Sequence, residues 1–402
     1  MKVLHVIPSI TKVRGGTSQA VLDMVKALRL SNVDAEIATT NDDGDNLLDV
    51  PLGKRIEFNH LPVWFFHRFS PDITAVREYA FSADLTQWLW QNIIKYELVH
   101  IHALFSYPST AAMAIARLKK IPYIVTPHGL LCEWSLEQSQ LKKQVYLKII
   151  EQANLNSSQA IHFTSQKEQQ EVLRLGLKSP NFVLPLGISL PNHISNASYR
   201  LRQKFNIPED EPVILFLSRL HYKKGLDYLI PALAKLAHHR FTFILAGSGN
   251  PDYEAEIESL LGSHRLHNRT RIVGFVAGET KDILMQGADL FVLTSHSENF
   301  AVSVLESLSV GVPVLVTPGV ALASVVQENQ LGYVPEMDVF AIANALEDFL
   351  NNPQIAKITG IRASQFIRNK YTLEKLASQM KHRYAKIINQ CSSSVFSKKD
   401  NI

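Results

Sequence analysis

Short apolar runs alternate with amphipathic helical patterns along nearly the whole chain, which is typical of parallel sheets covered by helices on both faces. In the first half the pattern predicts strands at Val3–Ile7, Ala35–Thr39, Leu98–His102, Tyr123–Thr126 and Ala160–Phe163. In the second half it predicts strands at Val213–Leu217, Phe241–Ala246, Arg271–Val273, Leu290–Leu293 and Val312–Val316. A strand, a loop and an amphipathic helix open each half, and the first of these helices is expected from about Thr17 to Leu30. The fold class is therefore α/β, with two Rossmann-like domains.

Chain breakers between the two halves predict a linker over Leu184–Pro212, which contains Pro185, Gly187, Pro191 and Pro208. We expect a first domain over residues 1–185, a second over 186–370, a crossover helix over 371–390 that returns to the first domain, and a flexible tail over 391–402. Two such domains are expected to face each other across a cleft.

Composition narrows the class of protein and its surroundings. With 402 residues and 46% hydrophobic residues, the chain can fill two cores. A net charge of +4 is too small and too dispersed to favour nucleic acid, whereas anionic small molecules fit. Cys132 and Cys391 form neither a disulfide framework nor a metal cluster, so a reducing compartment is expected. Since neither a signal-peptide core nor a run of roughly 20 apolar residues is evident, we expect a cytoplasmic protein.

The segment SENFAVSVLE, residues 297–306, follows an apolar strand and leads into a helix. At such a turn the backbone N–H groups of Asn299, Phe300, Ala301 and Val302 point out of the helix start, where they suit a phosphate. Glu298 precedes this helix and could meet a sugar near the phosphate, while Glu306, two turns on, could reach a ribose. A helix cap and a solvated face residue would also explain two glutamates.

The segment SRLHYKKG, residues 218–225, lies between the first strand and the first helix of the second half. Open α/β sheets bind ligands at such strand ends. Arg219 offers a planar fork for phosphate oxygens, Lys224 a compact charge, and Gly225 room for close approach. Together they could stabilise a leaving diphosphate, although a solvated basic loop is the alternative.

These two segments together resemble the retaining nucleotide-sugar glycosyltransferases of family four, which have the GT-B architecture. The resemblance extends to VIPSITKVRGGTSQAV near the amino terminus and to the central TPHGLL. It implies retaining transfer without a divalent metal or a cofactor, an acceptor-side first domain and a donor-side second domain. It also implies that Arg219 and Lys224 hold the diphosphate, Glu298 the sugar hydroxyls and Glu306 the ribose hydroxyls.

In the first domain the resemblance implies that Gly16 lets a loop approach the phosphates and that His128 lies beside the transferred sugar. Gly15 and Gly16 follow the first strand, and paired glycines also serve ordinary tight turns. His128 lies at a strand end, where we expect a hydrogen bond to the sugar rather than proton abstraction. His102 is expected to pack in the interior.

Four further positions are assigned to the donor. Gly247 and Gly249 close a strand and are expected to leave room for the nucleotide, although the turn alone would explain them. Val273 and Phe275 are expected to line the pocket for the base. Two departures from the family pattern are Ala301, where glycine is usual, and Leu186, where asparagine is common.

Two metal signals and one membrane signal are weaker. Asp43 and Asp45 lie in a polar loop that is expected to be a solvated turn, and His238-His239 lacks partner ligands in sequence. The segment around Leu141–Ile150, with three lysines, could dock on anionic lipid, but its charges form no clean stripe, which favours an ordinary core-facing helix.

The predicted partners are a nucleotide sugar and a saccharide or lipid-linked saccharide, with possible peripheral contact at the inner face of the plasma membrane. TPHGLL with nearby Trp134 is similar to transferases of surface or exported polysaccharide assembly. A nucleotide-sugar 2-epimerase of the same architecture, and a nucleotide-sugar binding protein without turnover, remain alternatives.

Overall fold

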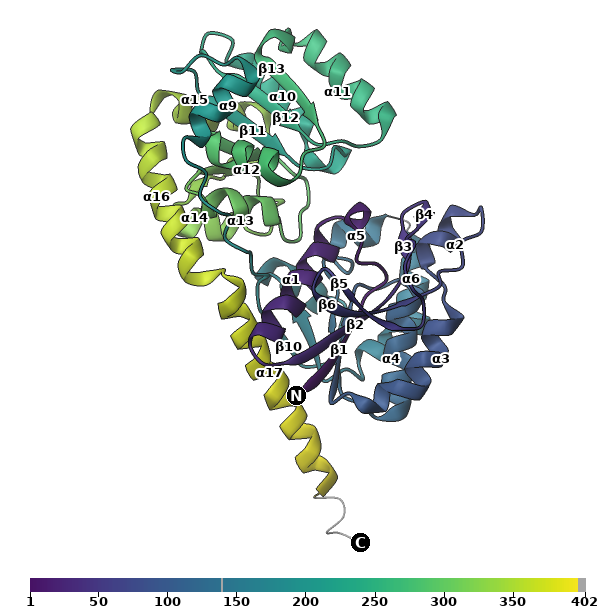
Figure 1. Cartoon of the computed structure of the whole chain (residues 1–402). Coiled ribbons are helices and arrows are strands. Elements are labelled where there is room, and N and C mark those ends of the chain that lie inside the picture. Colours follow the sequence, from purple (N-terminus) through teal and green to yellow (C-terminus); the bar gives the residue numbers. More distant parts are fainter. Residues whose placement is uncertain (139, 397–402) are drawn as a thin grey trace. The chain divides into compact units, whose positions relative to one another are not determined.

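The computed structural model describes residues 1–138 and 140–396, and for 392–396 the backbone alone. The chain divides into two compact units, Met1–Gly187 with the segment from Leu373 onward, and Ile188–Thr372. Each has its own sheet and helices (Figure 1). The predicted α/β class with two Rossmann-like sheets is confirmed.

Unit 1 contains an eight-stranded sheet in the order β10-β9-β8-β7-β1-β2-β6-β5, parallel except for the β5–β6 pair. Its strands are β1 (Lys2–Val6), β2 (Asp34–Thr40), β5 (Arg55–Phe58), β6 (Leu61–Phe66), β7 (Leu98–His102), β8 (Tyr123–Thr126), β9 (Ala160–Phe163) and β10 (Asn181–Val183). A separate hairpin pairs β3 (Asp42–Asp43) with β4 (Asn46–Leu47).

The helices of unit 1 cover both faces of this sheet. They are α1 (Gly16–Leu30), α2 (Thr74–Tyr79), α3 (Ala83–Asn92), α4 (Tyr107–Lys119), α5 (Glu133–Glu137), α6 (Gln140–Tyr146), α7 (Gln152–Leu155), α8 (Gln166–Leu173) and α17 (Leu373–Phe396). Short 3-10 turns η1 (Lys12–Arg14) and η2 (Ile93–Lys95) and the π-helical turn η3 (Leu147–Glu151) complete the unit.

Successive strand residues enter two different hydrophobic cores, because side chains alternate across a strand. In β1, Val3 joins the core that also contains residues of α1 and α17, whereas Leu4 joins the core beneath α3 and α4. The C-terminal helix α17 is therefore part of unit 1, as expected. Its described part continues to Phe396 rather than stopping near 390, because CSSSVF contains neither a proline nor a glycine. Residues 397–402 of the expected tail lie outside the described residues.

Unit 2 contains a six-stranded parallel sheet in the order β13-β12-β11-β14-β15-β16. Its strands are β11 (Val213–Leu217), β12 (Thr242–Ala246), β13 (Thr270–Gly274), β14 (Leu290–Leu293), β15 (Val314–Val316) and β16 (Gly332–Tyr333). Its helices are α9 (Ala197–Phe205), α10 (Leu226–Lys235), α11 (Pro251–Ser263), α12 (Gly278–Gly287), α13 (Val302–Ser309), α14 (Ala323–Glu328), α15 (Val339–Asn351) and α16 (Pro353–Lys370), with 3-10 turns η4 (Tyr222–Lys224) and η5 (His267–Arg269).

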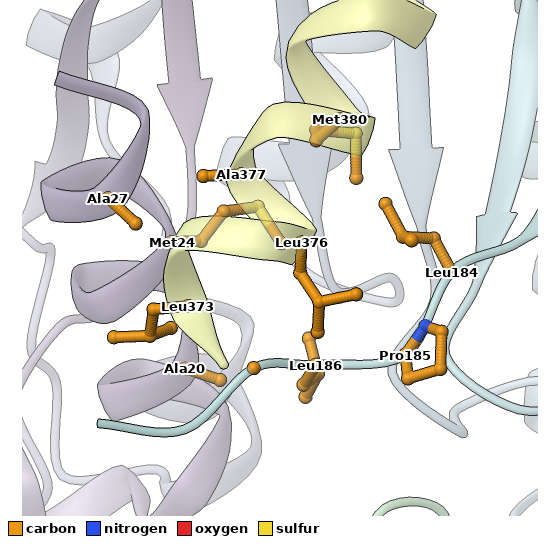
Figure 2. A pocket seen from close by; sticks show the side chains of 11 residues that line it. Ala20, Met24, Ala27, Leu184, Pro185, Leu186, Leu373, Leu376, Ala377 and Met380 are labelled. Carbon is orange, nitrogen blue, oxygen red and sulfur yellow. The ribbon is translucent and has the colours of Figure 1, made fainter. Parts of the chain in front are cut away.

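The chain passes between the units twice, after Gly187 and after Thr372. On the side of unit 1, the crossing segment packs so closely on α17 that a Cβ at Gly187 would lie 2.9 Å from the Cα of Leu373. Side chains of α1, α17 and the segment Leu184–Gly187 line a small apolar cavity of about 20 Å³ at this place (Figure 2). On the side of unit 2, the N–H of Ile188 donates to the carbonyl of Tyr371 at 2.9 Å. The two crossing segments are thus paired in each unit. The linker expected over 184–212 is narrower than predicted, because α9 occupies residues 197–205.

Candidate active site

The strand order of unit 2 creates a switch point between β11 and β14. From β11 the chain continues to β12 and β13 on one side, and β14 to β16 lie on the other. The loops that leave the carboxyl ends of β11 and β14 therefore diverge there, which is the place where open α/β sheets bind ligands. The first loop carries Arg219 and Lys224, and the second carries Glu298.

The loop after β11 is tied to the end of β14. Gly225 has a left-handed φ of 64°, and a Cβ there would lie 2.0 Å from the carbonyl oxygen of Thr294. The hydroxyl of Thr294 donates to the Gly225 carbonyl at 3.0 Å, and the N–H of His296 donates to the Lys223 carbonyl at 2.9 Å. Glycine is required at 225 by both its conformation and this close approach.

The ammonium of Lys224 forms an ion pair with the carboxylate of Glu298. Their side chains are only 12% and 21% exposed, so the pair is screened less than a surface pair. The backbone of Glu298 is fixed as well, because its N–H donates to the Gly319 carbonyl at 3.0 Å and its carbonyl accepts from the N–H of Ala321 at 2.9 Å. The two residues that the sequence predicted at the sugar and the phosphate therefore lie side by side.

The basic loop has a positive local potential. Arg219 is exposed and forms no ion pair within the described part of the chain. Partial burial, followed by the charges of Arg219, Lys223 and Lys224, lowers the pKa of His221. Such a loop at a strand end is suited to an anion.

Helix α13 begins directly beyond Glu298, with Ala301 as its N-cap and no acidic side chain in its first turn. Phe300 and Ala301 are buried, and Asn299 and Val302 are half-buried. Further along the helix, Glu306 accepts a hydrogen bond from the ammonium of Lys281 in α12 at 2.6 Å. Lys281 was not predicted, since nothing in the spacing of residues 281 and 306 indicates that α12 and α13 bring them together.

Packing explains only some of the remaining residues that the sequence analysis assigned to the donor. A Cβ at Gly247 would lie 1.9 Å from the Ser218 carbonyl oxygen, and one at Gly249 would lie 2.1 Å from that of Leu220. These two glycines are thus required by packing of the β12 end against the basic loop. Val273 is half-buried in β13, and Phe275 beyond it is 71% exposed.

Unit 1 has its own switch point, between β1 and β7, and the glycine loop lies there. From β1 the chain continues to β2 and β6 on one side, and from β7 to β10 on the other. Gly15 has a φ of 81°, and α1 starts at Gly16 without an acidic residue in its first turn. Within the described residues, a Cβ at either glycine would meet no atom within 4 Å. Packing therefore explains neither of them, in contrast to Gly247 and Gly249.

His128 lies at the end of β8 with a left-handed φ of 55°, a conformation that costs energy in a residue with a Cβ. The next peptide is anchored, because the N–H of Gly129 donates to the buried carboxylate of Glu168 at 2.6 Å. The Nε2 of His128 lies 3.1 Å from the Nδ1 of His102. Burial lowers the pKa of His128 to about 3, so its imidazole is neutral at pH 7.

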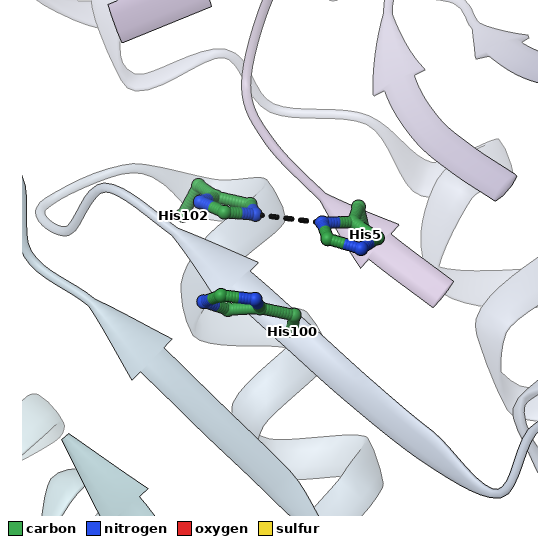
Figure 3. A group of neighbouring side chains, drawn as sticks. All are labelled: His5, His100 and His102. Atoms are coloured by element: carbon green, nitrogen blue, oxygen red, sulfur yellow. Dashed lines mark hydrogen bonds between the residues drawn. The ribbon is translucent and has the colours of Figure 1, made fainter. Parts of the chain in front are cut away.

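Behind His128 lies a cluster of buried histidines that the sequence analysis recognised only through His102. His5 Nδ1 lies 3.0 Å from His102 Nε2, and the ring of His100 stacks on that of His102 with centroids 4.2 Å apart. Figure 3 shows the nitrogens of His5 and His102 pointing at each other, as in a hydrogen bond, rather than toward a common third point, as metal ligands would.

Two surface features differ from or add to the sequence expectations. The segment of α6 and η3 is not core-facing, because Leu141, Val145 and Ile149 are 79%, 54% and 74% exposed. The helical period was correct, but the segment turns this apolar side toward solvent.

Asp43 and Asp45 belong to or flank the β3–β4 hairpin, and Asp45 forms an exposed ion pair with Arg77. None of the described helices is both long and apolar enough to cross a bilayer.

Comparisons with known proteins show what the chain resembles in sequence and in fold. The chain is 27% identical to the D-inositol 3-phosphate glycosyltransferase of Xylanimonas cellulosilytica over 334 residues, 79% of each protein. It is 27% identical to the putative teichuronic acid biosynthesis glycosyltransferase TuaC of Bacillus subtilis over 251 residues, 61% of this chain and 60% of that protein. The fold matches the Anabaena protein Alr3699/HepE, solved in complex with UDP-glucose, with a TM-score of 0.75, 21% identity, and coverage of 96% of this chain and 100% of that one.

Two family models account for most of the chain. Residues 15–187 match the glycosyl transferase 4-like domain, and residues 198–371 match the glycosyl transferases group 1. The first covers the glycine loop and His128, and the second covers the basic loop, Glu298 and α13. The protein is therefore an enzyme that belongs to the group 1 glycosyltransferases.

Proposed function

We propose that the protein transfers a sugar from a nucleoside-diphosphate sugar, with retention of anomeric configuration and without a metal ion, to a saccharide or lipid-linked saccharide acceptor. The observation that carries the proposal is the pairing of Lys224 with Glu298 at the switch point of unit 2. A cation for phosphate and a carboxylate for sugar hydroxyls are what a nucleotide-sugar site must place next to each other.

The diphosphate binds to Arg219, Lys224 and the start of α13. Lys224 and the start of α13 are held in place before the reaction, so they stabilise the charge that develops on the leaving diphosphate with little reorganisation. Glu298 accepts hydrogen bonds from sugar hydroxyls, and Glu306, held by Lys281, accepts them from the ribose. Val273 and Phe275 line the pocket for the base. UDP is a suitable first nucleotide to test, because the Anabaena neighbour was solved with UDP-glucose.

Retention follows from attack by the acceptor hydroxyl on the face from which the diphosphate departs, with the departing phosphate accepting the proton. This step rests on the sequence resemblance, as do the roles of Gly16 and His128 in unit 1. Their position at strand ends and the open space beside Gly15 and Gly16 support these roles.

Metal independence rests on the side chains that face the diphosphate site. Lys224 and Arg219 supply the positive charge there. The two groups of three candidate metal ligands in the described residues, His5-His100-His102 and His238-His239-Glu347, do not include Glu298 or Glu306.

The central experiment compares Lys224→Ala with Glu298→Gln. Lys224→Ala should weaken binding of the nucleoside diphosphate and lower turnover, because a hydrogen bond to a charged group contributes roughly 1.5–3 kcal/mol. Glu298→Gln keeps the size of the side chain but removes its charge, so turnover should fall strongly while diphosphate binding changes little. Arg219→Lys should resemble a milder loss of Lys224, because an ammonium lacks the planar fork.

Product analysis decides the reaction type. A panel of nucleotide sugars is first ranked by thermal stabilisation, since a ligand at 100 times its dissociation constant contributes about 2.7 kcal/mol. Release of nucleoside diphosphate only in the presence of an acceptor supports transfer. Formation of an epimer without an acceptor would instead identify an epimerase, and tight binding without any product would contradict the enzymatic proposal.

The acceptor is a saccharide used in the assembly of surface or exported polysaccharide. The segment formed by α6 and η3 makes peripheral contact with a membrane. Leu141, Val145 and Ile149 expose an apolar surface next to the exposed Lys142 and Lys148, a combination that favours anionic lipid. The relationship to a teichuronic acid transferase supports this acceptor class.

A vesicle assay tests the membrane contact. Leu141→Glu should reduce co-sedimentation with phosphatidylglycerol vesicles. Ile358→Glu, at a 59% exposed isoleucine of α16 in unit 2, is the matched control and should not change it. Equal binding of both variants would rule out this surface as the contact.

A further inference from the structure

A row of imidazoles joined by hydrogen bonds, here called a file, leads from His128 into the interior of unit 1. His128 Nε2 is bonded to His102 Nδ1 at 3.1 Å, and His102 Nε2 is bonded to His5 Nδ1 at 3.0 Å. His5 and His102 are completely buried, and burial lowers the pKa of all three rings. Each ring is therefore neutral and carries one N–H, so the hydrogen bonds of the file must all run in the same direction.

A second file of hydrogen bonds lies on the same face of the sheet. A single carbonyl group determines the direction in which these hydrogen bonds are donated. His162 Nε2 lies 2.7 Å from the carbonyl oxygen of Leu184, which can only accept, so His162 carries its hydrogen on Nε2. Its Nδ1 then accepts from the hydroxyl of Thr126 at 2.8 Å, and that oxygen accepts from His100 Nε2 at 2.6 Å. His100 Nδ1 is left to accept from the hydroxyl of Tyr384 in α17. Each tautomer of this file is fixed by hydrogen bonding.

The direction of the first file follows from its buried end. Within the described residues His5 Nε2 has no hydrogen-bond partner and no access to solvent. If His128 donated inward, each ring would donate in turn and the file would end on a buried, unpaired N–H of His5. If His5 donates outward, the file ends there on an unpaired lone pair. Unpaired buried N–H groups are the rarer case in proteins, so the outward direction is favoured.

Outward donation sets the state of His128. His5 donates to His102, His102 donates to His128 Nε2, and the single hydrogen of His128 must lie on Nδ1. Within the described residues this Nδ1 makes no hydrogen bond and is not among the buried polar atoms that lack a partner, so it reaches solvent. It lies at the carboxyl end of β8, where the proposed function places the transferred sugar.

We propose that His102 and His5 are positioning residues that hold His128 as the neutral Nδ1–H tautomer, so that it donates a hydrogen bond to an oxygen of the sugar and does not act as a base. This inference rests on the proposed function for the identity of the ligand but not for the tautomer. It gives the two interior histidines a role beyond packing, since an apolar side chain of similar size would fill the same space.

The first test reads the tautomer directly and requires no activity. Two-bond nitrogen–proton correlation spectra of the full chain, labelled with ¹⁵N-histidine, identify which ring nitrogen carries the hydrogen. The signals of His128 are those lost in His128→Gln. At pH 7 we expect a protonated Nδ1 and an unprotonated Nε2. A protonated Nε2, or an imidazolium, would overturn the proposal.

Variants then test whether His102 sets this tautomer. His102→Leu removes the donor, so the spectra should show His128 with its hydrogen on Nε2 or exchanging between both nitrogens, and turnover should fall about tenfold. His102→Asn keeps an N–H₂ group near the position of Nδ1 and should restore the tautomer and most of the turnover. An unchanged His128 spectrum in His102→Leu would refute the role of His102.

The matched control is His162→Leu. It also removes a completely buried imidazole from the same face of the sheet, but His162 makes no hydrogen bond to His5, His102 or His128. A similar loss of thermal stability is expected for both leucine variants, and only His102→Leu should change the His128 spectrum. If the chain transfers no sugar at all, the proposed function fails, while the spectra still decide the tautomer.

Discussion

Acidification from pH 7 to pH 5.5 should lower the free energy of unfolding of unit 1 by about 4–5 kcal/mol. The cause is a set of five histidines with lowered pKa values, the completely buried His5, His100, His102 and His162 together with His128. Burial lowers the pKa of His5 to about 3 and that of His162 to about 4, and burial together with the neighbouring histidines lowers those of His100 and His102 well below the usual value.

The sign follows from proton binding. An unfolded histidine with a pKa of about 6.5 takes up a proton in this pH range, whereas the buried rings stay neutral. The stability from their lowered pKa values is therefore present above pH 6.5 and is lost as the pH falls below it. Each histidine contributes slightly more than 1 kcal/mol less stability at pH 5.5 than at pH 7, which is about 6 kcal/mol for the five.

Glu151 acts in the opposite direction and reduces the total. Burial raises the pKa of its carboxyl to about 7. The folded protein binds this proton at pH 5.5 while the unfolded chain does not, which returns roughly 1–2 kcal/mol. A net loss of about 4–5 kcal/mol remains, a large part of the 5–15 kcal/mol by which domains are usually stable.

Tryptophan fluorescence measures unit 1 selectively, because all four tryptophans, Trp64, Trp88, Trp90 and Trp134, lie in it. Urea titrations between pH 5.5 and 7 should show that unfolding takes up about three protons at pH 6. His162→Gln should reduce this number by nearly one, because it removes one of the buried, neutral rings. Unfolding without proton uptake at pH 6 would refute the neutral, buried state of the cluster.

Three further outcomes are expected. Gly16→Ala should raise the KM for the donor sugar without lowering stability, since a Cβ there meets no neighbour. Gly247→Ala should instead destabilise unit 2, because a Cβ there would lie 1.9 Å from a carbonyl oxygen. Equal effects of the two substitutions in urea titrations would contradict this. Lys281→Met should weaken binding of nucleoside diphosphate in calorimetry about as much as loss of Glu306, and no change would remove Lys281 from the site. Treatment with EDTA should leave turnover intact, and its loss with recovery by manganese would disprove metal independence.

The repeated strand-loop-helix pattern was sufficient to predict most of the two sheets. Five of the ten predicted strands, among them Leu98–His102 and Leu290–Leu293, match the structure residue for residue. The strands β5 and β6 were missed, because the antiparallel pair lies outside the regular alternation of strands and helices. Helix α9 was missed because the prolines around it indicate a linker, and only packing against α12 shows that it belongs to unit 2.

Site residues were predictable where a motif keeps them close in sequence. SRLHYKKG and SENFAVSVLE identified two loops of unit 2. The fold brings these loops together at the ion pair of Lys224 with Glu298. The pairing of Lys281 with Glu306 depends on the packing of α12 against α13, which no local spacing encodes. The sequence also contains a signal for the two files of histidines. His5, His100, His102, Thr126 and His162 are polar residues in strands that the apolar pattern predicts to be buried.

The pairing of the two crossing segments affects the order in which the protein can fold during synthesis. Unit 1 begins at the first residue but is complete only when α17 has left the ribosome, because Leu376 and Met380 complete its core and Tyr384 donates to His100. Unit 2, about 185 residues, is made in between. At ribosomal rates of about 5–20 residues per second, unit 1 waits on the order of 10–40 s with an open core face. The second unit in the sequence can therefore be the first to become native, and a chain that stops before α17 would leave the histidine core unfinished.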